Sequence, residues 1–217
     1  MTTVYFVRHG ETDANIEGIL QGQSDHPLNE AGLAQADAVA SRLTSLSFDE
    51  ILSSDLFRAR VTAEKIARGR PVAYTPLLRE WCFGDWQGRR IGDLKSEFPA
   101  EFRLFAAQSP LFAPPGGESA DSFRLRAAQV MEELAQKYAG RTLLCVTHGG
   151  LLKQILKNVL GATACPALPA CGNASLSCFR TAGDHWQLVF WNDCSHLEYP
   201  LPEKNASPAE EEKSFAV

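Results

Sequence analysis

The chain has 217 residues, 45% of them hydrophobic and 22% charged, with a formal net charge of -5. This length fits one medium domain, which buries enough apolar surface to fold without disulfides or a metal. The acidic balance excludes a protein that binds nucleic acid or an anionic membrane through bulk positive charge. We therefore predict no nucleic-acid or membrane partner, and any cation that matters must act locally.

Buried strands and amphipathic helices alternate along the first part of the chain. Residues 3–7 are apolar enough to form a fully buried strand. The capping and spacing rules for helices and strands then predict the next elements. They are a helix capped by Asn29, a strand over 50–52, a helix from Ser54 or Asp55 to about Ala67, and a strand over 72–75.

Residues 76–118 are rich in glycine and proline and show no strong period. The segment is too long for a plain loop, so we expect short helices over 91–98 and 100–107. The elements expected after it are a helix capped by Ser119, a buried strand over 143–146, a helix over 151–160, and strands over 174–180 and 186–192. Such alternation predicts an α/β three-layer sandwich, with a mostly parallel central sheet and helices on both faces.

Five charged or titratable residues fall near strand ends and loop edges: Arg8, His9, Arg58, Glu80 and His148. Open α/β sheets bind ligands beyond the carboxyl ends of their strands, where Arg8, His9 and His148 are expected. Each residue alone also has a structural explanation, as a hydrogen-bonded surface histidine, a solvated helix arginine or a salt-bridged carboxylate. Taken together, they predict a cationic pocket with a single acid beside it.

Several kinds of site are not indicated by the sequence. It contains no GxGxxG or GxxxxGK[ST] motif, and no pair of histidines at the helical spacing of a zinc site. The six cysteines show no CxxC spacing, so we interpret them as reduced structural thiols and disfavour a Cys165–Cys171 bridge. No metal and no cofactor are predicted.

The motifs occur in a recognisable order along the chain. They are "RHGETDAN", "DHPLNEAGLAQA", "SSDLFRARVTAE", "EWCFGDWQG", "PPGGES" and "VTHGG". From Val4 to about Leu197 the chain resembles the histidine phosphatase superfamily, in its phosphoglycerate mutase-like branch. The pattern is most similar to that of the broad-specificity and α-ribazole phosphatases.

The resemblance implies roles for the clustered residues. His9 would attack phosphorus with a neutral ring and form a phosphohistidine, and nearby cations would lower its pKa. Glu80 would protonate the leaving alkoxide and then serve as base for the attacking water. The other acids that compete for this role are Asp13, Asp85 and Glu118.

Substrate binding is implied for a partly overlapping set. Arg8, Arg58 and His148 would hold the equatorial phosphoryl oxygens, where transition-state charge is spread. Asn15 is at the family position that hydrogen-bonds the phosphate, and Gly149 allows a ligand close to the backbone. The expected partner is a small phosphomonoester.

Two alternatives to a phosphatase remain. Mutases of the cofactor-dependent type carry a tyrosine and a lysine where Phe83 and Ile91 stand here, and a tandem arginine where only Arg103 is present. The neighbouring pair Arg89-Arg90 could nevertheless hold an anionic substrate, so a carboxylated sugar phosphate stays an alternative substrate. A phosphate-binding regulatory module without turnover is the other alternative, although every expected catalytic position is filled.

The chain divides into one predicted domain and a tail. Residues 1–199 form the expected histidine phosphatase domain, and residues 200–217 form an acidic, Pro/Glu-rich tail with little apolar surface. No charged leader with an apolar run and no membrane-length apolar segment is apparent. We expect a soluble cytoplasmic protein, and a homodimer is the assembly left open.

Overall fold

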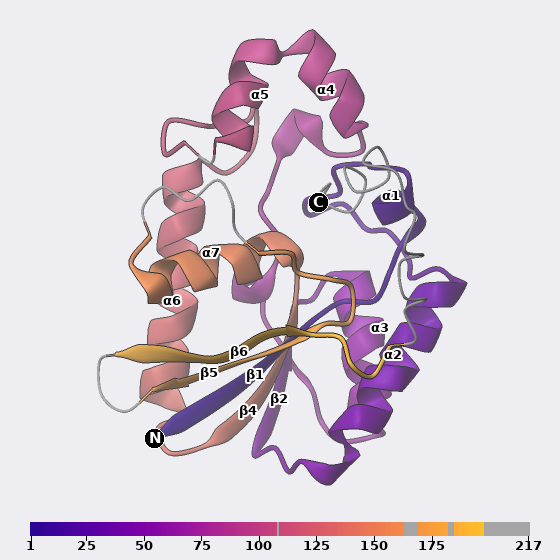
Figure 1. The fold of residues 1–217 in the computed structure, drawn as a ribbon, viewed down its shortest axis with the longest axis vertical. Coiled ribbons are helices and arrows are strands. Elements are labelled where there is room, and N and C mark those ends of the chain that lie inside the picture. Colours follow the sequence, from indigo (N-terminus) through magenta and orange to yellow (C-terminus); the bar gives the residue numbers. More distant parts are fainter. Residues whose placement is uncertain (108, 163–168, 182–184, 198–217) are drawn as a thin grey trace, which may run out of the picture.

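The computed structural model describes residues 1–107, 109–162, 169–181 and 185–197, and a six-stranded sheet runs through its centre (Figure 1). The strand order is β3-β2-β4-β1-β5-β6. The first four of these are parallel to one another, and β5 is antiparallel to both its neighbours. The strands are β1 (Thr2–Arg8), β2 (Glu50–Ser53), β3 (Ala73–Tyr74), β4 (Thr142–Thr147), β5 (Leu176–Thr181) and β6 (Trp186–Asp193).

Helices cover both faces of the sheet, which confirms the predicted α/β sandwich (Figure 1). Residues of β1 contribute to two hydrophobic cores, one on each face of the sheet. Val4 and Phe6 pack in the core under the helices of residues 120–137 and 149–160, whereas Val7 packs in the core under those of residues 30–42 and 57–67. The α-helices of the described residues are α1 (Asp13–Ile16), α2 (Glu30–Arg42), α3 (Phe57–Ala67), α4 (Ile91–Glu97), α5 (Pro99–Ala106), α6 (Ala120–Lys137) and α7 (Gly149–Leu160).

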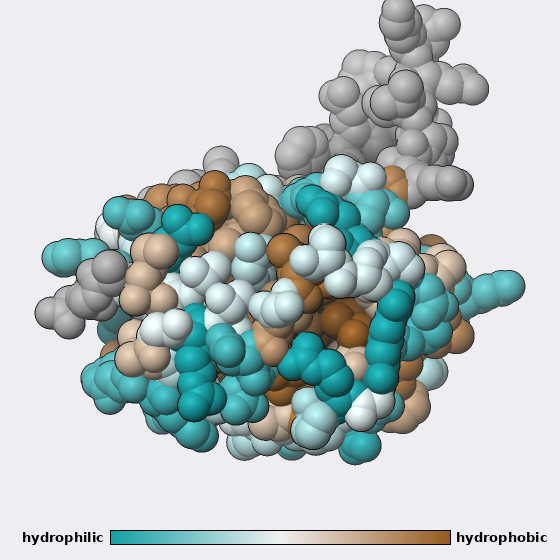
Figure 2. All heavy atoms as spheres, turned by 90° about the horizontal axis from the view of Figure 1, so that it is seen from below, coloured by the Kyte–Doolittle hydropathy of each residue, from teal (hydrophilic) through white to brown (hydrophobic). Residues whose placement is uncertain are grey.

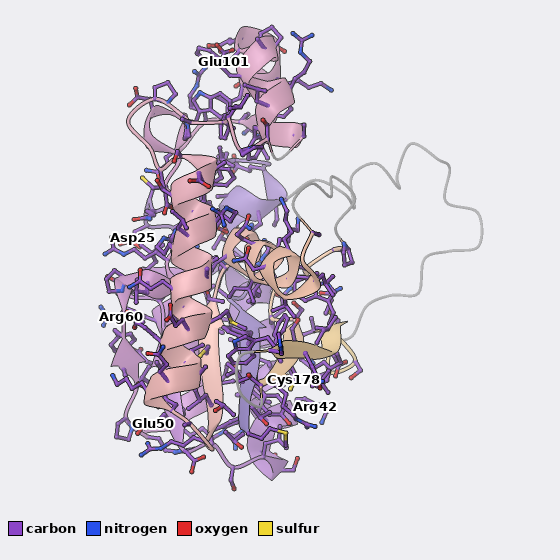
Figure 3. All side chains as sticks on the ribbon, turned by 90° about the vertical axis from the view of Figure 1, so that its left-hand side faces the viewer. Asp25, Arg42, Glu50, Arg60, Glu101 and Cys178 are labelled. Atoms are coloured by element: carbon purple, nitrogen blue, oxygen red, sulfur yellow. The ribbon has the colours of Figure 1, made fainter. Side chains whose placement is uncertain are left out.

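Helices α4 and α5 form a cap beyond the carboxyl ends of the parallel strands (Figure 1). Figure 3 shows the cap, with Glu101 on it, above α6 and far from Glu50 at the start of β2. Aromatic rings tie the cap to the sheet domain, for example Phe105 of α5 against Trp81 and Phe112. Such ring pairs contribute about 0.5–1.5 kcal/mol each beyond their buried area. At the other end of the sheet, polar and apolar residues are interspersed on the surface (Figure 2).

The helix caps at Asn29 and Ser119 are confirmed, because each side chain accepts a backbone N–H from the first turn. The predicted start of α3 is wrong. The helix begins at Phe57 rather than at Ser54 or Asp55, since both of those side chains bond elsewhere. A carboxylate from another loop, that of Asp25, accepts the Phe57 N–H instead at 2.9 Å.

Other predictions can be checked only within the described residues. There, no helix combines the length and the apolar character needed to cross a membrane. Cys82, Cys145, Cys171 and Cys178 are free thiols. Cys165 and the predicted tail, residues 200–217, lie outside the described residues.

Two glycines let the loop after β1 approach α2 closely. A Cβ atom added at Gly32 would clash with the backbone of Glu11, and one added at Gly10 would clash with the Gly32 carbonyl. Neither collision involves the end of a flexible side chain, so the backbone itself would have to move. This contact fixes the position of Gly10 directly after His9.

We expect Gly32→Ala to lower the free energy of unfolding by about 1–3 kcal/mol, the usual cost of overpacking. Gly92→Ala is the matched control, because a Cβ there meets nothing within 4 Å and the residue lies in α4. The control should gain about 0.5–1 kcal/mol from lower chain entropy in the unfolded state. Urea unfolding measures both, and equal stability of the two variants would contradict the close contact.

Candidate active site

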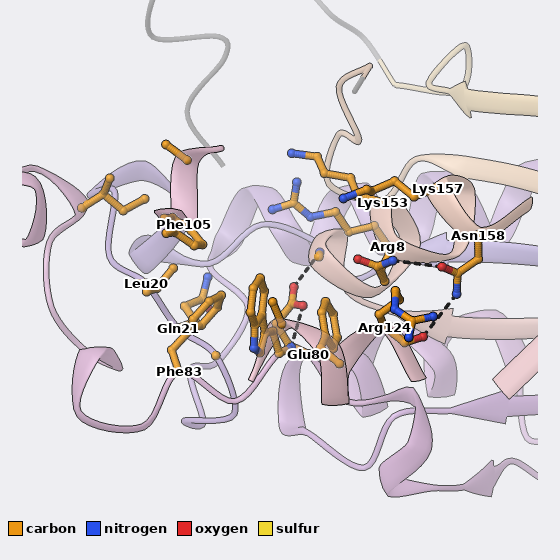
Figure 4. Close-up of a pocket in the computed structure, with 18 of the residues that line it drawn as sticks. Arg8, Leu20, Gln21, Glu80, Phe83, Phe105, Arg124, Lys153, Lys157 and Asn158 are labelled. Carbon is orange, nitrogen blue, oxygen red and sulfur yellow. Dashed lines mark hydrogen bonds between the residues drawn. The ribbon is translucent and has the colours of Figure 1, made fainter. Parts of the chain in front are cut away.

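Residues from four parts of the chain meet at one edge of the sheet. Arg8 ends β1 and His9 follows it, His148 follows β4, Arg58 is the second residue of α3, and Glu80 follows a short 3-10 helix. A cavity of about 1190 Å³ lies here, and its lining includes Arg8, His9, Arg58 and Glu80. Figure 4 shows Arg8 and Glu80 in it. The structure therefore brings together the residues that the sequence predicted to cluster.

The ring of His9 is held in one tautomer. Its Nδ1 atom lies 2.7 Å from the Gly10 carbonyl oxygen, which can only accept a hydrogen bond. Nδ1 must therefore carry the proton, and in the neutral ring Nε2 carries the lone pair. The Nε atom of Arg58 donates to this Nε2 at 3.3 Å.

Burial lowers the pKa of His9 well below its usual value, and the positive charges of Arg58 and Arg8 lower it further. The sequence predicted the direction from the cations, whereas the larger cause is desolvation. At neutral pH the ring is uncharged and Nε2 has a free lone pair, as a nucleophile requires.

Arg58 is almost fully buried, yet carbonyl oxygens rather than carboxylates satisfy its guanidinium. Nη1 donates to Ser24 at 2.8 Å and Nη2 to Gly22 at 2.7 Å. Burial lowers its pKa to about 10, so it stays charged at neutral pH. The loop that supplies these carbonyls has no sequence signal of its own, and motif analysis missed it.

The ring of His148 lies beside that of His9, with 5.1 Å between the ring centres. Its Nε2 is 2.8 Å from the hydroxyl of Ser54, which also accepts the N–H of Leu56. The Ser54 hydroxyl can therefore donate to Nε2, which leaves the proton of a neutral ring on Nδ1. Nδ1 is buried without a hydrogen-bond partner among the described residues. Burial and nearby cations lower the pKa of His148.

Two further donors face the site. Arg8 donates from Nη1 to the Cys171 carbonyl, while its buried Nε has no partner among the described residues. Asn15 lines the cavity, and its Oδ1 accepts from the Thr12 N–H and from Asn173 at 3.1 and 3.2 Å. With the carbonyl of Asn15 used in this way, its amide NH₂ remains as the donor for a ligand.

Glu80 sits at the N-terminus of α7. Its two carboxylate oxygens accept the backbone N–H groups of Trp81 and Gly150, each at 2.8 Å. A Cβ atom at Gly150 would clash with this carboxylate. Gly150 lines the cavity, whereas the predicted ligand contact Gly149 packs against the guanidinium of Arg8.

Arg126 of α6 is a positioning residue that the sequence did not reveal. Its guanidinium donates to the carbonyls of Leu77, Arg79 and Glu80 at 2.7–3.0 Å. It also forms a two-pronged ion pair with Glu118, in which both side chains are only 15–16% exposed. This network holds the backbone that carries Glu80, and it commits Glu118 to a structural bond rather than to acid chemistry.

The walls of the cavity differ in character (Figure 4). One side is aromatic, with Phe83 and Phe105, and the other is basic, with Lys153 and Lys157 of α7. Trp86 and Phe112, which are also aromatic, are buried in the core and do not line the cavity. The lysines were missed because helical periodicity does not show which polar positions face a cavity.

Arg89 and Arg90, which the sequence had suggested as ligands for a carboxylated sugar phosphate, do not line the cavity. Arg89 pairs with Glu97 at 2.5 Å, and Arg90 pairs with Glu17 at 2.8 Å. Within the described ranges, no group of histidine, cysteine, aspartate or glutamate side chains could hold a metal ion.

Comparisons with known proteins agree on one family. The family model described as "Histidine phosphatase superfamily (branch 1)" matches residues 4–194. The chain is 36% identical to a metal-independent phosphoserine phosphatase of Arabidopsis thaliana, over 91% of this chain and 84% of that protein. It is 33% identical to an adenosylcobalamin/α-ribazole phosphatase of Salmonella typhimurium, over 86% and 89%.

A solved structure agrees with these relatives. The phosphoserine phosphatase of Entamoeba histolytica, in complex with 3-phosphoglyceric acid, superposes with a TM-score of 0.82 at 30% identity. The match covers 91% of this chain and all of that one. The resemblance inferred from the motifs is thus confirmed, and the chain belongs to branch 1 of the histidine phosphatase superfamily.

Proposed function

We propose that the chain hydrolyses small phosphomonoesters through a phosphohistidine formed on His9. The observation that carries this proposal is the neutral His9 ring, whose unprotonated Nε2 faces a cavity lined by Arg8 and Arg58. Carbonyl oxygens, rather than carboxylates, accept hydrogen bonds from both guanidinium groups, so no acidic partner cancels the positive charge and a phosphate dianion is the ligand that fits. The phosphatase relatives support the same reaction class.

In the first step, Nε2 of His9 attacks phosphorus and the bond between phosphorus and the ester oxygen breaks. Arg58, which donates to Nε2 in the free site, turns its Nε–H to a phosphoryl oxygen. The buried, unpartnered donors on Arg8 Nε and His148 Nδ1 supply further bonds, and charge developing on the oxygens strengthens all of them. Glu80 enters this step as the carboxylic acid and donates its proton to the departing alkoxide, so the alcohol leaves neutral and Glu80 is left as a carboxylate.

In the second step, water attacks phosphorus from the side that the alcohol has left. Glu80, now a carboxylate, takes a proton from that water while the bond between phosphorus and Nε2 breaks. Inorganic phosphate leaves and His9 returns to its neutral form. One residue serves as acid and then as base because both proton transfers occur at the same side of phosphorus.

Hydrolysis is favoured over a mutase reaction by the charges around the cavity. Arg89 and Arg90 pair with surface acids, and Arg103 of the cap does not line the cavity. We further propose a cytoplasmic setting, which suits the free thiols of the described cysteines. A homodimer remains open as the assembly, and we propose that the tail, residues 200–217, is dispensable for folding because it has little apolar surface.

Replacing the nucleophile tests the proposal most simply. His9→Ala should lower turnover of p-nitrophenyl phosphate by about 10⁴-fold or more, because it removes the ring nitrogen that attacks phosphorus. His185→Ala removes an exposed histidine and should retain full activity. Wild-type activity should survive EDTA; activity that disappears with EDTA and returns only with a divalent ion would contradict the mechanism.

Glu80→Gln tests the role of Glu80 as proton donor, because it removes the acidic proton and keeps the size of the side chain. The burst rate with an alkyl phosphate should fall about 10²–10⁴-fold, since a poor leaving group needs a proton. With p-nitrophenyl phosphate the burst should change far less, because that leaving group departs as a stable anion. Asp85→Asn, which removes an exposed neighbouring charge, should leave both rates unchanged.

Rapid-quench measurement of the first turnover is needed, because slow hydrolysis of the phosphohistidine could hide the difference in steady state. Equal losses of burst rate with the two substrates would show that Glu80 does not protonate the leaving group.

A further inference from the structure

One face of α7 runs from the phosphate site along the cavity wall. Gly149, Lys153 and Lys157 are spaced by four residues, so they share this face. At Gly149 the face touches the Arg8 guanidinium, since a Cβ atom there would lie 3.3 Å from the Arg8 Nε. Lys153 follows one turn later, about 6 Å further along the helix axis. Both lysines line the cavity (Figure 4).

The ammonium of Lys153 has neither a hydrogen bond nor an ion pair within the described part of the chain. The carboxylate of Glu80 interacts electrostatically with this ammonium, but both Glu80 oxygens already accept backbone N–H groups. Burial and the positive charge of Arg8 lower the pKa of Lys153, so the environment disfavours the charged form. A half-buried cation without a partner anion is unfavourable, and an anion in the cavity would relieve this.

The other basic groups near the cavity are engaged differently. Arg124 of α6 donates to Asp121 at 2.8 and 3.1 Å, which neutralises it locally. Lys157 is more deeply buried than Lys153 and lies one further turn from the phosphate site. Lys153 is thus the cation placed to contact a group close to the ester phosphate.

We infer that Lys153 binds a second anionic group of the substrate, a carboxylate, which lies about one helical turn from the ester phosphate. This inference rests on the proposed phosphatase function and names its substrate class: phosphorylated hydroxy or amino acids with a short carbon chain between the two charges. A single ammonium suits a carboxylate, whereas a second phosphate dianion would need more donors. Any further substituent would lie against Phe83 and Phe105 on the opposite wall.

Matched substrate pairs test the inference directly. Phosphoserine differs from phosphoethanolamine, and 3-phosphoglycerate from glycerol phosphate, by a carboxylate in place of hydrogen or a hydroxymethyl group. For each pair the quantity measured is the ratio of kcat/KM for the acid to that for its partner. This ratio does not depend on the fraction of folded enzyme, so a partly unfolded variant remains informative.

Lys153→Met should lower the ratio about 10–100-fold, the usual value of one hydrogen bond to a charged group. Lys153→Gln should give a similar loss, and Lys153→Arg should restore most of the ratio because it keeps the cation. Lys95→Met is the matched control: it removes the same charge from an exposed site outside the cavity and should leave the ratio unchanged.

Two results would overturn the inference and are distinguishable. If the wild type hydrolyses both members of a pair and Lys153→Met leaves the ratio unchanged, Lys153 does not bind the carboxylate, while the phosphatase function stands. If the wild type hydrolyses none of these esters and no p-nitrophenyl phosphate, the proposed function itself fails. A lower ratio in Lys153→Met that Lys95→Met reproduces would also contradict a local contact, because general charge loss would explain it.

Discussion

The hydrogen bond between Nδ1 of His9 and the carbonyl of Gly10 is the constraint on which the site depends. It fixes the tautomer, and so it decides that Nε2 is the atom with the lone pair. The bond is rigid because β1 lies inside the sheet, between β4 and β5, and because Gly10 packs tightly against Gly32 of α2. A buried strand and two glycines thereby determine the orientation of one imidazole ring.

The second requirement is a cation cluster whose charge is not neutralised by protein carboxylates. Arg58 and Arg8 are buried, and burial of a charge is costly unless polar groups solvate it. Carbonyl oxygens of Gly22, Ser24 and Cys171 do this, since they stabilise the guanidinium groups without cancelling their charge. The cavity thus stays positive, and a phosphate dianion completes it.

Sequence reasoning predicted those features that depend on local patterns. The position of His9 at a strand end follows from the apolar run before it, and the caps at Asn29 and Ser119 follow from side-chain chemistry. The start of α3 was missed because the carboxylate that accepts the N–H of Phe57, that of Asp25, comes from a distant loop. No local rule could indicate that contact.

The roles of the cavity wall also required the tertiary structure. Trp86 and Phe105 are both aromatic residues of the segment 76–118, which shows no strong period, yet Trp86 is buried in the core and Phe105 lines the cavity. Lys153 is one of several polar residues on α7, and its importance emerges only when the helix is placed beside Arg8. Likewise, the bonds from Arg126 to residues 77–80 span more than forty residues of sequence.

The proposed mechanism depends on the protonation state of the His9 ring, which ¹⁵N NMR of labelled protein measures. The signals of His9 can be assigned by their loss in the His9→Ala variant. We expect a neutral ring with the proton on Nδ1 at pH 6.5, the ordinary pKa of histidine, and at lower pH as well, because burial and two arginines oppose protonation. A doubly protonated ring at neutral pH, or a neutral ring with the proton on Nε2, would contradict it.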